Sequence, residues 1–214
     1  MENRKMKLYM IAINIFAIMI LLTLFGLTST LVKRQELDNT KLILSDVVDI
    51  PFSLAESMEK EIRISGNDFR EPIKNDYLGI IDKMKYGKNN FFFIVDGNGR
   101  MVHHPLAPEL TWWNMNFETD KNGNFFFRDI IQFAKRDGFF YREIDWQSKY
   151  NKELYEPQII YGRYFWSWDW IICTVIYENE LESLTTNSGI YFSFAAVIQI
   201  LLNTIIYVIY RKKS

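Results

Sequence analysis

Two long stretches without a formal charge constrain this chain more than any other feature of its sequence. Leu8–Val32 holds 25 uncharged residues, and Ser183–Tyr210 is also uncharged, with its apolar part at Ile190–Tyr210. A bilayer's hydrocarbon core of about 30 Å is crossed by roughly 20 helical residues, and a helix satisfies its own backbone hydrogen bonds in lipid. We therefore predict two transmembrane helices, at 8–32 and 188–210.

A cleaved signal peptide is the alternative for the first stretch. Its apolar region would be only about 7–15 residues long, followed by a cleavage site of small residues. The stretch at 8–32 is longer, and no Ala-x-Ala pattern follows it. We expect an uncleaved anchor.

The orientation in the membrane follows from the basic residues at the chain ends. The tails at 1–7 and 211–214 carry three Lys or Arg residues each, whereas Lys33 and Arg34 on the far side of the first span oppose them only weakly. Short basic tails remain in the cytoplasm. Both termini are therefore predicted to be cytoplasmic, with one domain at 33–187 outside the cytoplasm.

The net charge of this outer segment excludes one class of binding partner. Taking the six basic residues of the tails from 25, and Glu2 from 26 acids, leaves it a formal charge of −6. An acidic domain does not suit nucleic acid, which requires a basic face. Cys173 is the single cysteine, which excludes an intrachain disulfide, and its apolar surroundings predict a buried thiol.

Three helices are predicted in the outer segment. Between Glu36 and Gly66 apolar residues recur every three or four positions, which indicates an amphipathic helix whose stripe could be a domain face, a dimer seam, or both. Its members are Leu37, Ile43, Val47, Ile50, Leu54, Met58 and Ile62. Pro51 should kink or divide this helix. Further helices are predicted at 67–86 and 125–136, with Gly87 and Gly138 after them.

The remaining segments predict antiparallel strands. Phe91–Val95 and Arg100–His104 flank an Asp-Gly-Asn-Gly hairpin turn. Pro105–Glu118 and Gln147–Pro157 are predicted as loops. Three further strands are predicted at Phe139–Trp146, Ile159–Phe165 and Trp170–Tyr177. With helices packed on one face, these elements predict an α+β domain with a sheet of about five strands.

The segment from Tyr86 to Leu181 resembles the single Cache domain of the second type, a PAS-like sensor module of bacterial chemoreceptors and sensor kinases. The resemblance rests on the order and spacing of Lys85-Tyr86-Gly87, Asn90–Asp96, Gly99–Val102, His104-Pro105, Pro108–Leu110, Asp120–Gly123, Ala134-Lys135, Gly138-Phe139, Pro157–Tyr161, Trp168–Ile171 and Ile176-Tyr177.

This resemblance implies a PAS-like sheet behind a long N-terminal helix, in a homodimer held in the inner membrane of a bacterium, with the domain periplasmic or extracellular. It also implies a pocket on one face of the sheet for a short carboxylate, such as acetate, propionate, lactate or pyruvate, or another small solute. The predicted pocket residues are Phe91, Phe93, His104, Tyr141, Arg142, Gln158 and Tyr161.

Two departures from the family pattern bear on the ligand. Gln158 stands where the family has lysine, and a glutamine can hydrogen-bond but cannot pair with a carboxylate. Cys173 and Val175 replace a near Gly-x-Gly, which narrows the expected space. Arg142 is the candidate replacement cation. A neutral ligand, or an anion held by Arg142 or His104, fits equally well.

Other motifs are better explained structurally. His103 and His104 are adjacent and point to opposite faces of a strand, so no metal site or cofactor is expected. Asp120-x-Asn122-Gly123 lacks the bidentate Glu of a calcium loop and predicts a turn. Trp112-Trp113 could be a lid or a membrane contact. His104 and the aromatic strand residues could also be structural.

The sequence supports two functional hypotheses and no enzyme, because it has neither a Gly-rich phosphate loop nor Gly-x-Ser-x-Gly. The first is a sensor that binds a small molecule. Since only four residues follow Tyr210, we expect it to relay its signal to a separate protein. The second is a non-signalling accessory or scaffolding subunit of a transporter or envelope complex.

Overall fold

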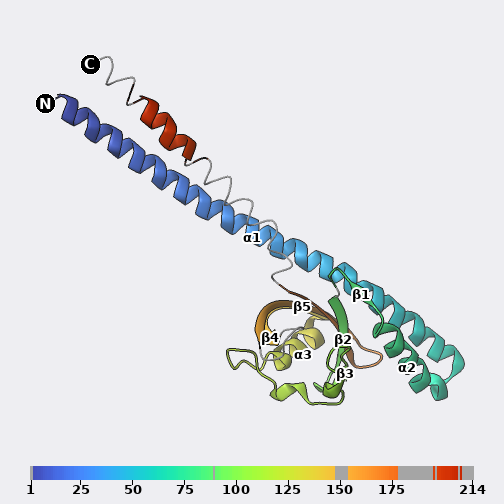
Figure 1. The fold of residues 1–214 in the computed structure, drawn as a ribbon. Helices are drawn as coiled ribbons and strands as arrows, with labels where there is room; N and C mark the ends of the chain where they lie inside the picture. The colour runs from blue at the N-terminus through green and yellow to red at the C-terminus, as the bar shows by residue number, and fades with distance from the viewer. Residues whose placement is uncertain are drawn as a thin grey trace. The chain divides into compact units, whose positions relative to one another are not determined.

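The computed structural model of the chain describes residues 2–88, 90–147, 154–177, 195, 197–206 and 208. The chain divides into two compact units, Met1–Asp38 with Leu181–Ser214, and Asn39–Glu180. Helix α1 (Glu2–Ser65) has residues in both units (Figure 1).

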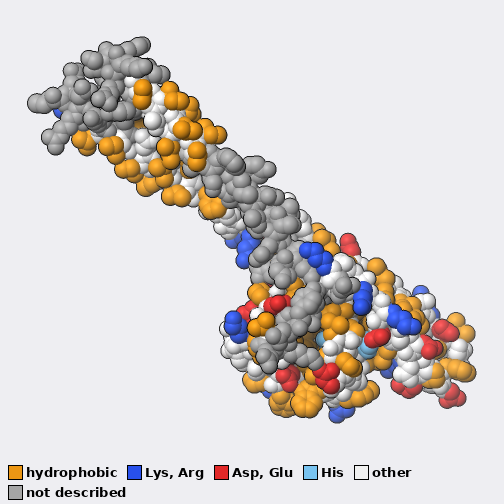
Figure 2. Space-filling model, in the orientation of Figure 1, with side chains coloured by type: hydrophobic (Ala, Val, Ile, Leu, Met, Phe, Trp, Pro, Cys, Tyr) orange, Lys and Arg blue, Asp and Glu red, His pale blue; other side chains and the backbone are white. Residues whose placement is uncertain are grey.

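The first unit contains the predicted membrane anchor. In the described part of the chain, one helix is long and apolar enough to cross a membrane. It is α1, whose candidate range is Ile11–Ser65, and its most apolar window is not buried. Figure 2 shows hydrophobic side chains along this part of α1. Of the second predicted span, Val197–Ile206 is a short apolar helix, and most other positions lie outside the described residues. The second span therefore stays a prediction.

The second unit contains an antiparallel sheet in the order β1-β2-β6-β5-β4, with β3 paired to β2. Its strands are β1 (Lys85–Tyr86), β2 (Asn90–Asp96), β3 (Met101–His103), β4 (Phe139–Gln147), β5 (Tyr155–Phe165) and β6 (Trp170–Tyr177). All five predicted strands are present. The predicted helix at 67–86 was too long, since α2 (Arg70–Ile81) ends earlier and Lys85-Tyr86 turns at Gly87 to pair with β2.

Helices cover both faces of the sheet, whereas the sequence pattern predicted helices on one face only. Helix α3 (Phe126–Asp137) packs on the face that carries Phe93 and Cys173, and α1 and α2 contact the opposite face through Tyr161 and Trp170. The reason is visible in β2, where Phe91–Val95 is buried without alternation, as in strands covered on both sides.

Helix α1 is not divided at Pro51, although the ring removes one intrahelical hydrogen bond. Pro51 is buried, and Tyr77 of α2 donates its Oη–H to the Pro51 carbonyl oxygen, 3.0 Å away. The buried side of α1 also differs from most of the predicted apolar stripe. Leu44 and Val48 are buried, whereas Ile43 and Ile50 are 55% and 61% exposed.

The segments around α3 follow the prediction closely. Gly138 takes the left-handed conformation (φ 83°) that ends the helix. The loop at 105–118 contains two short 3₁₀ helices, η2 (Pro108–Leu110) and η3 (Met115–Phe117). Asp120 forms the predicted turn, accepting hydrogen bonds from the backbone N–H groups of Asn122 and Asn124. The predicted loop at 147–157, by contrast, was too long, because Gln147 belongs to β4 and Tyr155–Pro157 to β5, where the two strands pair. Residues 148–153 lie outside the described residues.

Candidate functional site

A small cavity lies on the α3 face of the sheet, with a volume of about 70 Å³. A cavity of about 150 Å³ accommodates benzene, so this one suits a ligand of about three or four non-hydrogen atoms. It is lined by Phe91, Phe93, Met101, His104, Leu106, Ala107, Leu110, Met115, Phe126, Phe127, Trp146, Gln147, Gln158, Ile160, Val175 and Tyr177.

Strand register brings the lining residues together. Phe91 and Phe93 of β2 alternate in the same sense as Val175 and Tyr177 of β6, and Gln158 of β5 pairs with Tyr177. Alternate residues of a strand share a face, which puts all of these side chains on the face beneath α3.

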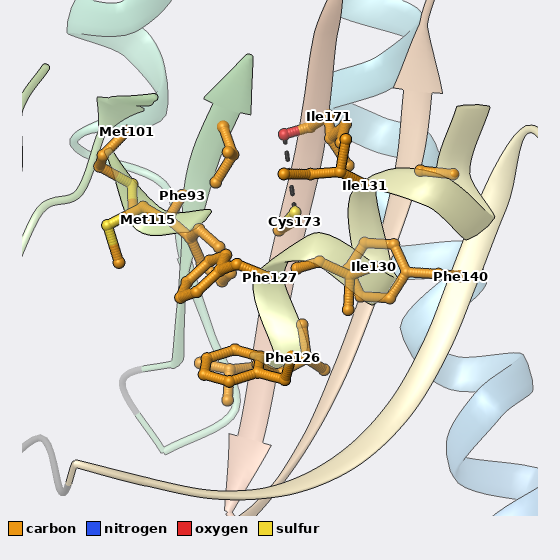
Figure 3. Packing of buried hydrophobic residues seen from close by; sticks show 14 of the residues in the cluster. Phe93, Met101, Met115, Phe126, Phe127, Ile130, Ile131, Phe140, Ile171 and Cys173 are labelled. Atoms are coloured by element: carbon orange, nitrogen blue, oxygen red, sulfur yellow. Dashed lines mark hydrogen bonds between the residues drawn. The ribbon is translucent and has the colours of Figure 1, made fainter. Parts of the chain in front are cut away.

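The first turn of α3 closes the apolar part of the cavity. Phe126 and Phe127 have ring centroids 4.3 Å apart, and Phe126 meets Trp146 of β4 edge to face at 4.8 Å. Figure 3 shows Phe127 directed toward Phe93 and Met115. These aromatic walls offer dispersion contacts to a small ligand.

Gln158 supplies the best-defined polar group of the cavity. Its side chain is buried, with the residue only 3% exposed. Nε2 donates to the carbonyl oxygens of Gln147 at 2.8 Å and Trp146 at 3.2 Å, at the end of β4. The amide is thus held by two backbone groups of the neighbouring strand.

The two histidines diverge as their adjacency predicted. The ring of His104 lies against Phe91 and Phe93, with centroids 5.1 and 5.7 Å away, and lines the cavity. His103 instead has its Nε2 3.5 Å from Asp82 Oδ1. Burial lowers the pKa of His103, and the Asp82 carboxylate opposes that shift. Among the described residues, no group of three or more His, Cys, Asp or Glu residues could hold a metal ion.

Three predicted pocket residues are not among those that line the cavity. Tyr141 and Tyr161 are cross-strand partners on the α1 face, where Tyr161 Oη donates to Ser45 Oγ at 3.2 Å. Arg142 pairs in register with Ile160, a cavity residue, but its guanidinium carbon lies 4.0 Å from the Phe133 ring centroid on α3. Strand alternation thus puts the two tyrosines on the face opposite the cavity. The contact with Phe133 holds the Arg142 side chain away from the cavity lining.

Several residues that line the cavity were not among the pocket residues predicted from the sequence. Trp146 and Ile160 share a face with Phe91, so strand parity together with the observed pairing would have found them. Ala107 and Leu110 belong to a segment without helix or strand periodicity, so periodicity could not place them at the cavity, although Pro108–Leu110 contributes to the family resemblance. Trp112 and Trp113, considered as a lid, are 67% and 56% exposed and do not line the cavity.

Cys173 and Val175 occupy different places. Val175 lines the cavity, whereas Cys173 is buried in the core, where burial raises the pKa of its thiol. A Cβ on the neighbouring Gly162 would lie 2.9 Å from Cys173 Sγ and 2.5 Å from Phe140 Cε1, so glycine is needed for this packing.

Comparison with known proteins identifies this arrangement. A model of the Cache domain family matches residues 35–182, which is more than half of the chain. The chain belongs to the Cache domain family. It has a single Cache sensor domain, like the periplasmic domains of bacterial chemoreceptors and sensor kinases. This segment is a sensor domain rather than a catalytic one.

Two curated relatives share the Cache segment. The sensor histidine kinase MctS of Rhizobium johnstonii is 24% identical over 121 residues, which are 56% of this chain and 26% of that protein. The methyl-accepting chemotaxis protein McpP of Pseudomonas putida is 21% identical over 122 residues, 57% of this chain and 22% of that protein. This chain therefore matches about a quarter of the length of these relatives.

Solved structures share the fold. A periplasmic sensor domain of a chemotaxis protein superposes with a TM-score of 0.62 at 19% identity, covering 66% of this chain and 96% of that one. A Cache chemosensory domain described for carboxylic acid recognition gives 0.61 at 21% identity, covering 65% and 94%. A methyl-accepting chemotaxis protein from Vibrio parahaemolyticus gives 0.60 at 22%, covering 72% and 99%. At these identities the likeness establishes the fold alone.

Proposed function

We propose that this chain is a membrane-anchored sensor of the bacterial cell membrane, which binds a small molecule outside the cytoplasm and relays binding to a separate signalling protein. The observation that carries the proposal is the aromatic cavity on the α3 face, which Phe91, Phe93, His104 and Gln158 line together. The family membership supports it, as do relatives named as a sensor kinase and a chemotaxis protein.

Strand β5 is proposed to carry the signal because its two faces serve different partners. Gln158 and Ile160 line the cavity, while Tyr161 bonds to Ser45 and Arg163 forms an ion pair with Asp49. A ligand that displaces the first pair of residues therefore acts on the attachment of α1. The ligand must prefer one of two packings, since equal affinity for both transmits nothing.

The arrangement in the membrane belongs to the same proposal. We place both termini in the cytoplasm, a second span at 188–210, and a homodimer of two copies along the outer part of α1. Ile43 and Ile50, exposed one heptad apart on this helix, support the dimer because they leave an apolar stripe available to a second copy.

A second candidate is an accessory subunit that uses the outer domain to bind a transporter or envelope protein. The observation in its favour is that three aromatic side chains of the 105–118 segment form an exposed set, namely Trp112, Trp113 and Phe117. This surface would be dispensable for ligand binding in the sensor and required for partner binding in the accessory subunit. Replacing all three residues by serine distinguishes the two functions.

The sensor is tested with the full chain in lipid nanodiscs. Short acids, amides, amines and alcohols are screened for a rise in the thermal unfolding midpoint, and binding is confirmed by calorimetry. Ala107→Leu fills the cavity and should abolish the response to every probe, with the circular dichroism spectrum retained. Arg142→Ala, outside the cavity lining, is the matched control and should bind as wild type.

Two results would overturn the proposal. One is the absence of any stabilising probe in the screen. The other is unchanged binding in Ala107→Leu, which would show that the ligand occupies another part of the domain.

A further inference from the structure

Carboxylate, ammonium and guanidinium groups are absent from the cavity lining that the structure describes, and His104 contributes its one imidazole. The predicted cation, Arg142, lies over the Phe133 ring and donates from Nη1 to the Tyr141 carbonyl oxygen at 3.1 Å. A buried charge costs several kcal/mol unless it is paired. Without such a partner in the cavity, a ligand with a positive or a negative charge is disfavoured.

The orientation of the Gln158 amide is determined by its neighbours. Both groups that contact Nε2 are backbone carbonyl oxygens, of Trp146 and Gln147, and these can only accept hydrogen bonds. Exchanging Nε2 and Oε1 would place three acceptor oxygens together and lose both hydrogen bonds. These two carbonyl oxygens therefore fix which atom of the Gln158 amide is the nitrogen and which is the oxygen.

What remains of Gln158 is an acceptor. No residue in the described part of the chain donates to Oε1, although the side chain is almost completely buried and lines the cavity. Oε1 is not among the fully buried polar atoms that lack a partner, so a small molecule in the cavity can reach it. A ligand with an N–H or O–H group can donate to Oε1, whereas a carboxylate would place a second acceptor and a negative charge beside it.

The size and walls of the cavity complete the specification. About 70 Å³ admits about three or four non-hydrogen atoms, and the phenyl rings suit a methyl or short alkyl group. We propose that the cavity selects a short uncharged hydrogen-bond donor, a primary amide in the first place, which donates to Gln158 Oε1. This inference rests on the proposed function and names the ligand class of that site.

Acetamide and acetate test it, because they have nearly the same shape and differ in a neutral NH₂ donor against a charged acceptor oxygen. Titration calorimetry at pH 7.5 on the full chain in nanodiscs should show acetamide binding about tenfold more tightly than acetate. An acetate oxygen cannot donate to Oε1, and one lost hydrogen bond of about 1.4 kcal/mol corresponds to tenfold in affinity. Ethylamine, a charged donor, should also bind more weakly than acetamide.

Gln158→Lys should reverse this preference. An ammonium group has three donors, so it can keep both bonds to the carbonyl oxygens of β4 and offer a positive charge to acetate. Arg142→Ala should leave the preference of the wild type unchanged. The wild-type comparison stands even if Gln158→Lys does not fold.

The outcomes separate this inference from the proposed function. If acetate or ethylamine binds the wild type as tightly as acetamide, the inference is wrong and the sensor remains. If no probe in the panel binds, both fail. If acetamide is preferred but Gln158→Lys folds and keeps that preference, Gln158 is not the selecting residue and the inference fails.

Discussion

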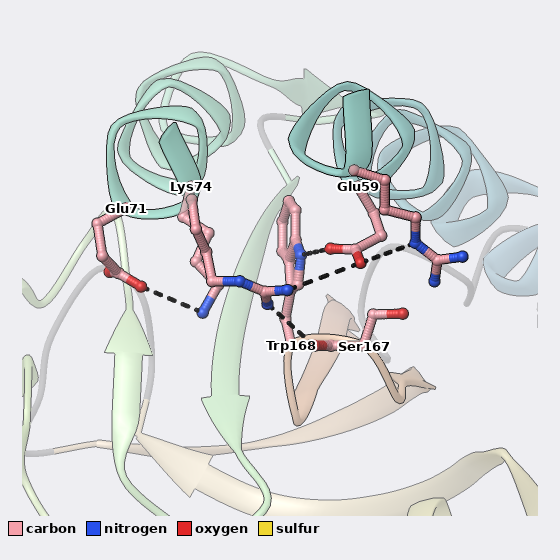
Figure 4. A network of polar contacts seen from close by, with 7 residues as sticks. Glu59, Glu71, Lys74, Ser167 and Trp168 are labelled. Atoms are coloured by element: carbon pink, nitrogen blue, oxygen red, sulfur yellow. Dashed lines mark hydrogen bonds and ion pairs between the residues drawn. The ribbon is translucent and has the colours of Figure 1, made fainter. Parts of the chain in front are cut away.

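The two faces of the sheet are built from different interactions. The α3 face is packed almost entirely by apolar and aromatic side chains and retains a cavity of about 70 Å³. The α1 face carries directional contacts, including the Arg163–Asp49 ion pair and the hydrogen bond from Trp168 Nε1 to Glu59 Oε2 at 2.7 Å. Figure 4 shows Glu59 and Trp168 within that polar network.

This difference separates two tasks. Apolar packing is non-directional, so the α3 face can adjust when a small molecule fills its cavity. Hydrogen bonds and ion pairs depend on distance and angle, so the α1 face holds the helix in one position and responds when a strand moves. Binding and transmission can thus lie on opposite sides of β5.

The largest effect is expected from a cavity cut into the α3 face. Ile130 is fully buried in its core, and Ile130→Ala should lower the free energy of unfolding by about 2–5 kcal/mol. Urea unfolding of the full chain in detergent, followed by tryptophan fluorescence, measures this. Ile64→Ala, at an exposed position of α1, is the control and should change it by less than about 0.5 kcal/mol. A small loss at Ile130 would mean that this face is not tightly packed.

The next largest effect tests the α1 face through Glu59. Its carboxylate accepts from the Trp168 indole and lies 3.2 Å from Arg63, so Glu59→Ala leaves a buried N–H unpaired and should cost about 1–3 kcal/mol. Glu71→Ala removes the ion pair with Lys74. The Glu71 side chain is 76% exposed, and the Lys74 ammonium keeps its contact with the Trp170 ring, so the change should cost at most about 0.5 kcal/mol. The same unfolding assay compares the two, and equal losses would contradict the role assigned to burial.

A third experiment separates transmission from binding. Asp49→Asn removes the ion pair with Arg163, which is partly exposed, so stability should fall by no more than about 1 kcal/mol. Ligand affinity should stay within about twofold, because the cavity is on the other face. Spin labels are attached at Ser53→Cys and Asp129→Cys in two proteins, one with Asp49→Asn and one with Asp49 unchanged. The distance between the labels should change less on ligand binding in Asp49→Asn. Asp46→Asn, at an exposed neighbouring position, is the matched control. If Asp49→Asn shows the same ligand-dependent distance change as the protein with Asp49, transmission through the Arg163–Asp49 ion pair is excluded.

The smallest effect concerns His103 and pH. Burial lowers its pKa below the ordinary 6.5, so the unfolded chain binds its proton more readily than the folded one. The stability contributed by neutral His103 is complete above pH 6.5 and is lost as the pH falls toward the folded-state pKa. His103→Gln should reduce the stability difference measured between pH 7.5 and pH 5.5. Asp82→Asn should enlarge it, because Asp82 raises the pKa of His103.

The sequence predicted the strands well because strand signals are local. The apolar run of β2, its hairpin turn and the residues of β6 at Trp170–Tyr177 needed no tertiary information. The helix at 67–86 was overestimated, because the two-residue strand β1 exists only through pairing with β2. The side of α1 that packs on the sheet was also not predictable. Two neighbouring stripes, one with Ile43 and one with Leu44, are both apolar.

The cavity could be predicted only in part. Four of the seven predicted residues line it, namely Phe91, Phe93, His104 and Gln158. Their common face follows from strand alternation. Arg142 lies on that face by its pairing with Ile160, yet its side chain extends over Phe133 of α3, which strand pairing does not place. Contacts between a strand and a helix are not encoded in either element's own periodicity.

The sequence by itself determined the apolar anchor at the N-terminus and a sheet domain of the Cache type beyond it, because hydropathy and strand patterns are properties of short segments. Only the tertiary structure decided that helices cover both faces, that a small cavity remains beneath α3, and that the amide nitrogen of Gln158 faces the carbonyl oxygens of Trp146 and Gln147. These depend on which segments pack together, and packing is a property of the whole domain.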